Sequence, residues 1–161
     1  MKKIILFGLV VLGMTFFSLT AKAQTTNQQV ADEIMNMVKA HWAADIADPT
    51  NAAEINKNTA DDYTEFNPAY STRIDGKATG MRLAEASSKD PNRRVAAEML
   101  NPKVQVYGDV AILTYNYAGV TKNKDGETKP SRAKSTRVYA KIAGKWKLVH
   151  GNFASDPMPK D

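Results

Sequence analysis

The chain has 161 residues, 43% of them hydrophobic, with no cysteine and two histidines. This composition fits one domain with an ordinary core and excludes disulfides, thiol catalysis and thiolate metal sites, so we predict neither metal nor cofactor. Lys and Arg number 22 against 17 Asp and Glu, but three of the basic residues precede residue 24 and the others are dispersed among acids, which argues against nucleic-acid binding.

The first 23 residues have the pattern of a secretory signal peptide. Lys2 and Lys3 precede an apolar run at 4–19, and Ala21 and Ala23 supply the small residues of a cleavage site. The run is shorter than the roughly 20 residues that a membrane-spanning helix needs. We therefore expect residues 1–23 to be removed and residues 24–161 to form a single domain. That domain would be exported, periplasmic or secreted in a bacterium, with no membrane anchor after cleavage.

Three helices are expected in the first half of the mature chain. Thr26 and Gln29 have the spacing of a capping box and predict a helix over about 27–47. Its apolar stripe, expected to pack on a sheet, consists of Val30, Ile34, Met37, Val38 and Trp42. Asp48 followed by Pro49 predicts a second, short helix over about 49–57 with Asp48 as its N-cap. A strand at about 62–67 and an Asp-Gly turn then precede a third helix over about 77–88.

The second half reads as a run of antiparallel strands. Alternating apolar and polar residues predict strands at about 94–107, 109–120, 131–142 and 145–155. Asn101 and Pro102 interrupt the first of these strands and predict a bulge there. Ala143 and Gly144 form the turn of the last hairpin, and a polar loop covers about 122–130. Helices followed by antiparallel strands predict an α+β fold.

Several short motifs occur in the same order as in a known domain. They are Y-T-E-F-N-P at 63–68, M-L-N-P at 99–102 followed by Y-G-D at 107–109, and T-R-V-Y at 136–139 followed by G-K-W at 144–146 and V-H at 149–150. This set resembles the association (hub) domain of calcium/calmodulin-dependent protein kinase II, over about residues 30–157. That domain belongs to the nuclear transport factor 2-like superfamily, with ketosteroid isomerase and the SnoaL-like polyketide cyclases. The resemblance implies a cone-shaped, cystatin-like fold: a curved antiparallel sheet wrapped around a long N-terminal helix, with a pocket at the open end.

Only part of the basic pocket of the hub transfers to this chain. Arg137 matches the arginine of the T-R-V motif, whereas the second and third arginines of the family fall on Asn116 and Phe153, and its histidine falls near Gly80. One arginine beside Asn and Phe indicates a weakly charged ligand or a single carboxylate contact. We therefore expect a small organic ligand, a carboxylate among the candidates. The expected binding residues are Arg137, Asn116, Tyr63, Glu65, Phe153 and Tyr139.

Two interpretations of Arg137 stay open: it fixes an acidic ligand, or it forms a structural ion pair with Glu65. Two functions stay open as well. The first is an exported, non-catalytic module for small-molecule binding or oligomerisation. The alternative is a SnoaL-like or ketosteroid isomerase-like lyase or isomerase that abstracts a proton with Glu65 or Asp62 as base. A kinase is excluded, because the chain has no Gly-rich nucleotide loop and no H-R-D or D-F-G motif.

The histidines and tryptophans are interpreted as packed residues. His41 and His150 each lie in an apolar stripe or beside Trp, so we expect each to be packed with one hydrogen bond, and Trp42 and Trp146 to belong to the core. The resemblance also implies a homo-oligomer, most simply a dimer formed through the outer face of the sheet. The candidate residues for that face are Tyr115, Tyr117 and Val149.

Overall fold

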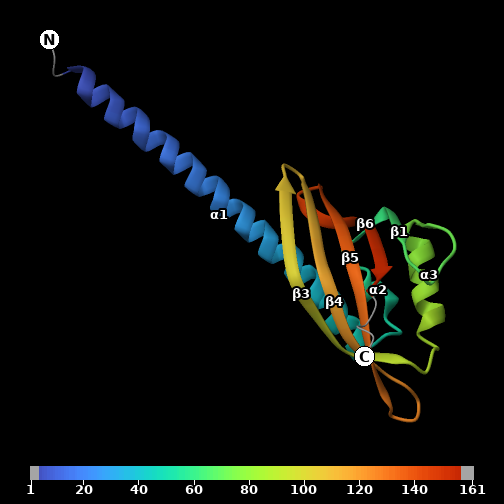
Figure 1. Ribbon diagram of the computed structural model, residues 1–161. Helices are drawn as coiled ribbons and strands as arrows, with labels where there is room; N and C mark the ends of the chain where they lie inside the picture. The colour runs from blue at the N-terminus through green and yellow to red at the C-terminus, as the bar shows by residue number, and fades with distance from the viewer. Residues whose placement is uncertain (1–3, 157–161) are drawn as a thin grey trace.

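The computed structural model describes residues 4–156, with side chains from Thr26 onward (Figure 1). These residues form helices α1 (Ile4–Ala47), α2 (Ala52–Ile55) and α3 (Lys77–Ser87), and strands β1 (Thr59–Phe66), β2 (Ile74–Asp75), β3 (Arg93–Tyr107), β4 (Val110–Lys122), β5 (Thr128–Ile142) and β6 (Lys145–Ser155). The predicted α+β fold is confirmed. Within the part of the chain whose side chains the structure describes, no helical stretch is long and apolar enough to cross a membrane.

The strands form one curved sheet in the order β2-β1-β6-β5-β4-β3. The expected antiparallel pairing holds for β3, β4, β5 and β6. The short strand β2, which was not predicted, also pairs antiparallel with β1, whereas β1 and β6 run parallel. A parallel pair needs a long connection, and α3 with four strands, β2 to β5, lies between these two. The predicted bulge in β3 is confirmed, because the register shifts between Leu100 and Lys103 and Asn101 has φ 50.

Two predicted helix starts are wrong. α1 ends at Ala47 as expected, but it runs through Thr26 without a break, since no Gly or Pro interrupts the chain from residue 21 to 47. The N-cap of α2 is Asn51, whose side chain accepts a hydrogen bond from the Glu54 backbone N–H at 3.1 Å. Asp48 instead closes a turn by accepting from Thr50, so the helix starts later and is shorter than predicted.

The core lies between the C-terminal half of α1 and the inner face of the sheet (Figure 1). Ile34, Val38 and Trp42 of the predicted stripe are buried. They pack in one cluster with residues of β1 and β4–β6, namely Tyr63, Ala111, Leu113, Tyr115, Tyr139, Trp146 and Leu148. Each large side chain buried there contributes about 1.5–3 kcal/mol. The core role predicted for both tryptophans is confirmed.

Tyr115 and Tyr117 lie on the inner face of the sheet, so their assignment to the outer face is wrong. Their rings contact Trp42 edge to face, with centroids 5.7 and 5.5 Å from the Trp42 ring. Residues at odd positions along this part of β4 point inward, because side chains alternate between the two faces. Val149 is half-buried where the β6 register shifts, and it is skipped in the pairing with β5.

Candidate functional site

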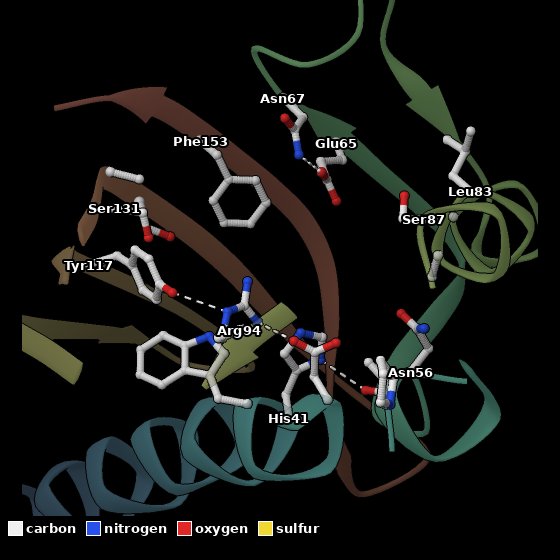
Figure 2. Close-up of a pocket in the computed structure, with 18 of the residues that line it drawn as sticks. His41, Asn56, Glu65, Asn67, Leu83, Ser87, Arg94, Tyr117, Ser131 and Phe153 are labelled. Atoms are coloured by element: carbon white, nitrogen blue, oxygen red, sulfur yellow. Dashed lines mark hydrogen bonds and ion pairs between the residues drawn. The ribbon is translucent and has the colours of Figure 1, made fainter. Parts of the chain in front are cut away.

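A cavity of about 730 Å³ lies between the inner face of the sheet and the helices (Figure 2). α1 contributes His41, α3 contributes Leu83, and β1, β3 and β6 contribute Glu65, Arg94 and Phe153, which point into the same space. This volume lies in the range of small-molecule sites. The cavity is therefore the candidate ligand site.

Arg137 is the buried cation of this cavity. Its residue is 6% exposed, its Nε donates a hydrogen bond to the Tyr115 hydroxyl at 3.0 Å, and its guanidinium carbon lies 5.1 Å from the centre of the Phe153 ring. Among the described residues, no carboxylate forms an ion pair with it. The predicted alternative of an ion pair with Glu65 is therefore wrong, because the side chain enters the concavity and turns toward Tyr115.

Ser135 places an unused hydroxyl beside Arg137. It lies two residues earlier on the same inward face of β5, it is 5% exposed, and it lines the cavity. Its Oγ is buried without a hydrogen-bond partner among the described residues. An unsatisfied buried polar group costs about 1–3 kcal/mol, so this hydroxyl is available to a ligand. The sequence analysis missed Ser135, although its i−2 spacing from Arg137 in a strand was visible.

Glu65 enters the cavity from β1 and is held by neutral donors. Its Oε2 accepts from the Tyr63 hydroxyl at 2.7 Å, and its Oε1 accepts from Asn67 Nδ2 at 2.8 Å. Burial and the adjacent Glu65 charge raise the pKa of Tyr63 above its ordinary range. A β-carbon added to Gly151 would lie 2.6 Å from the Tyr63 hydroxyl, so glycine leaves the room that this phenol occupies.

A second arginine, Arg94, reaches the cavity from the start of β3 and was missed by the sequence analysis. Its Nη1 pairs with Asp45 Oδ2 at 2.6 Å, and its Nε donates to the Tyr117 hydroxyl at 3.0 Å (Figure 2). Asp45 lies on the last turn of α1, 49 residues away in sequence. The Arg94–Asp45 pair forms only when α1 packs on β3, so no local sequence motif predicts it.

His41 is a neutral hydrogen-bonding group at the inner end of the cavity. Its Nδ1 lies 2.9 Å from the Ile55 carbonyl oxygen. A carbonyl only accepts, so Nδ1 carries the proton and Nε2 keeps a free lone pair. Burial, with the charges of Arg137 and Arg94, lowers the pKa of His41 to about 3. The prediction of a packed histidine with one hydrogen bond is confirmed here, and also for His150, which bonds Thr64 Oγ1 at 2.9 Å.

The structure brings together four of the six predicted binding residues at the cavity wall. These four are Tyr63, Glu65, Arg137 and Phe153. Tyr139 is buried below them and lines a small hollow with Arg137 and His41, where burial raises its pKa.

Asn116 and Asp62 lie away from the cavity wall. Asn116 occupies the opposite face of β4 from Tyr115 and donates to Asp156 Oδ2 at 3.1 Å, so its predicted place in the pocket is wrong. The side chain alternation of β4 explains the error. Asp62, one of the two proposed bases, is exposed and does not line the cavity.

Comparisons with solved structures show a shared fold. The association domain of Caenorhabditis elegans CaMKII superposes with a TM-score of 0.67 at 21% identity, covering 81% of this chain and 98% of that one. A nuclear transport factor 2-like superfamily protein from Salmonella enterica gives 0.68 at 17% identity, covering 83% and 95%. A ketosteroid isomerase-like protein from Parabacteroides distasonis gives 0.62 at 21% identity, covering 76% and 85%.

Comparison of the sequence with models of protein families assigns the chain to a family. No curated protein sequence matches the chain significantly. The model of the calcium/calmodulin dependent protein kinase II association domain matches residues 30–158, from the first turn of the core-packing part of α1 to beyond the end of β6. The match therefore includes every strand of the sheet and every residue of the cavity named above. The chain belongs to the calcium/calmodulin-dependent protein kinase II association domain family, which has the nuclear transport factor 2-like fold.

Proposed function

We propose that the cavity binds a small organic acid and that Arg137 is its anchor. The observation that carries this proposal is a buried guanidinium without a carboxylate partner among the described residues. Burying an unpaired charge is costly, and a carboxylate ligand supplies the missing partner with the planar geometry that a guanidinium prefers. The unsatisfied Ser135 hydroxyl gives the same ligand a further hydrogen bond.

The proposed role is binding rather than catalysis. The alternative, a lyase or isomerase, needs a carboxylate that is free to take a proton from the substrate. Hydrogen bonds from Tyr63 and Asn67 fix the orientation of the Glu65 carboxylate, so it can accept a further hydrogen bond but cannot turn toward a C–H bond of a substrate. Asp62 is exposed outside the cavity. These contacts favour a module that holds a molecule over one that transforms it.

A thermal-shift series tests the anchor. Hexanoate and benzoate should raise the melting temperature of the wild type but not that of Arg137→Gln, which removes the charge. Arg137→Lys should recover only part of the shift, because Lys keeps the charge and loses the two-pronged geometry. Arg82→Gln on exposed α3 removes an equal charge outside the cavity and should behave as wild type. Equal stabilisation of wild type and Arg137→Gln would refute the proposal.

We also propose that the domain self-associates, as the names of its relatives suggest. Large apolar side chains stay exposed at one end of the sheet: Tyr107 is 61% exposed, Val110 39% and Ile142 47%. Tyr107 and Val110 are paired across β3 and β4, and Val110 pairs with Ala140 of β5, so this apolar surface is continuous. Light scattering of residues 24–161 should show a dimer or larger species that Val110→Glu weakens. A monomer at every concentration would contradict it.

Export is proposed from the N-terminal pattern alone. When the whole chain is expressed in a bacterium, the protein recovered outside the cytoplasm should begin at Gln24. Sequencing of its N-terminus by mass spectrometry checks this. Full-length protein that remains in the cytoplasm would show that the cleavage pattern is not used.

A further inference from the structure

The cavity wall carries two opposite charges that do not neutralise each other. Arg137 enters from β5 and bonds Tyr115, while Glu65 enters from β1 and accepts from Tyr63 and Asn67. Neither forms an ion pair with another described residue. A site with a separated cation and anion is complementary to a ligand that carries both charges, because the anionic group of the ligand can pair with the cation and its cationic group with the anion.

The other ionisable groups inside the cavity do not fill this role. Arg94 and Asp45 neutralise each other at 2.6 Å. His41 donates Nδ1–H to a backbone carbonyl, and its ring is neutral because burial and the charge of Arg137 lower its pKa to about 3. The remaining charged lining residues, Asp90, Arg93 and Arg132, are exposed at the rim, where water screens them.

The two uncompensated charges are separated by strand β6, because Glu65 of β1 and Arg137 of β5 are both paired with Gly151. The Tyr63 hydroxyl donates to Glu65 at 2.7 Å and occupies the space beside the α-carbon of Gly151. Because Tyr63 is 5% exposed and its position depends on the space left by Gly151, the separation is built into the core of the fold. Glu65 still has lone pairs for a further donor, since a carboxylate offers about four acceptor sites and two are used.

From this arrangement we infer that the ligand is a zwitterion, whose carboxylate pairs with Arg137 and Ser135 and whose ammonium group pairs with Glu65. The inference rests on the proposed acid-binding function and adds the second charge of the ligand. It selects amino-carboxylic acids in which a short chain separates the two groups, since strand β6 lies between Glu65 and Arg137 in the sheet.

Matched probes test the second charge separately from the first. Calorimetry compares δ-aminovalerate with hexanoate, and ε-aminocaproate with heptanoate; in each pair a methyl group replaces the ammonium. The wild type should bind at least one amino acid about tenfold more tightly than its matched acid, as expected for a charge-assisted hydrogen bond. Glu65→Gln should abolish this preference and leave hexanoate binding in place. Glu98→Gln, an exposed charge outside the cavity, should keep the preference.

The outcomes separate the inference from the function on which it rests. The zwitterion assignment is wrong if neither amino acid binds more tightly than its matched acid, or if the preference for the amino acid survives in Glu65→Gln. In either case the proposed acid binding still stands, provided that hexanoate binding depends on Arg137. If no probe binds the wild type, both are wrong. Retained hexanoate binding by Glu65→Gln also shows that the variant is folded, so a lost preference reports on the charge of Glu65.

Discussion

Arg137 of β5 and Tyr115 of β4 are diagonal neighbours on the inner side of the sheet, joined by a 3.0 Å hydrogen bond from the guanidinium Nε to the phenol oxygen. Both residues are buried, at 6% and 5% exposure. The bond satisfies one donor of the guanidinium and aims the rest of the group toward Phe153, whose ring lies 5.1 Å from it. Tyr115 thereby orients the proposed anchor without needing to contact the ligand.

Tyr115→Phe should destabilise the fold and weaken acid binding together. The change leaves a buried, charged donor without its acceptor, which costs about 1–3 kcal/mol. Urea unfolding measures the loss of stability, and the hexanoate thermal shift measures binding. Tyr107→Phe is the matched control, because the Tyr107 hydroxyl accepts from Gln105 on the exposed surface and should contribute little. Equal stability of the two variants would mean that the Arg137–Tyr115 bond carries no net energy.

His41 should make the stability depend on pH below neutrality. Its pKa is about 3 in the folded protein, lowered from 6.5 mainly by burial and by Arg137, so between these values the unfolded chain binds more protons. Stability should therefore fall as the pH decreases from about 6.5 toward 3, by up to about 1.4 kcal/mol per pH unit. Urea unfolding at pH 7 to 5 would show this slope, which His41→Gln should reduce. Parallel slopes for the two proteins would contradict the assignment.

The strands were predictable because their signals are local. Alternation along the chain placed β3 to β6 within three residues of their observed ends, and Asn101 and Pro102 announced the bulge. The parallel pairing of β1 with β6 was not predictable, since the partners are separated by most of the domain. The start of α1 was missed because a capping pattern at Thr26 has no effect where the preceding residues also continue the helix.

The residues of the candidate site were predictable only where they belong to a recognisable sequence motif in a strand. Arg137, Glu65, Tyr63 and Phe153 came from motifs and do line the cavity. Asn116 was misplaced because a local alignment carries no information on which face of the strand a residue occupies. Tertiary packing brings Arg94 and Asp45 together, and it also leaves the buried Ser135 hydroxyl without a hydrogen-bond partner among the described residues. No pattern within one segment of the sequence could predict either feature.

Ala143→Asn should stabilise the protein. Ala143 and Gly144 form the two-residue turn between β5 and β6 with φ 49 and 77, a conformation that Asn and Gly tolerate better than Ala. We expect a gain of about 0.5–1 kcal/mol, read from urea unfolding. Gly144→Ala should have the opposite effect, because it adds a β-carbon at the second positive φ. No change for either variant would indicate that the turn relaxes without cost.

Asp45→Asn should strengthen acid binding at the cost of little stability. Asp45 now neutralises Arg94 on the cavity wall, and both side chains are about 30% exposed, so the pair contributes only about 1 kcal/mol to folding. Asn keeps an oxygen that can accept from Arg94 but removes the negative charge, which leaves the cavity more positive. We expect hexanoate to bind several-fold more tightly, with a steeper dependence on salt.

The control for this prediction is Asp75→Asn, which breaks the exposed Arg73–Asp75 pair away from the cavity. It removes the same charge from the protein as a whole, so a purely global electrostatic effect would act in both variants. Calorimetry with hexanoate should show tighter binding for Asp45→Asn alone. Equal affinities for the two variants would mean that Arg94 does not contribute to the field that a bound acid experiences, and that Arg137 acts without a second cation.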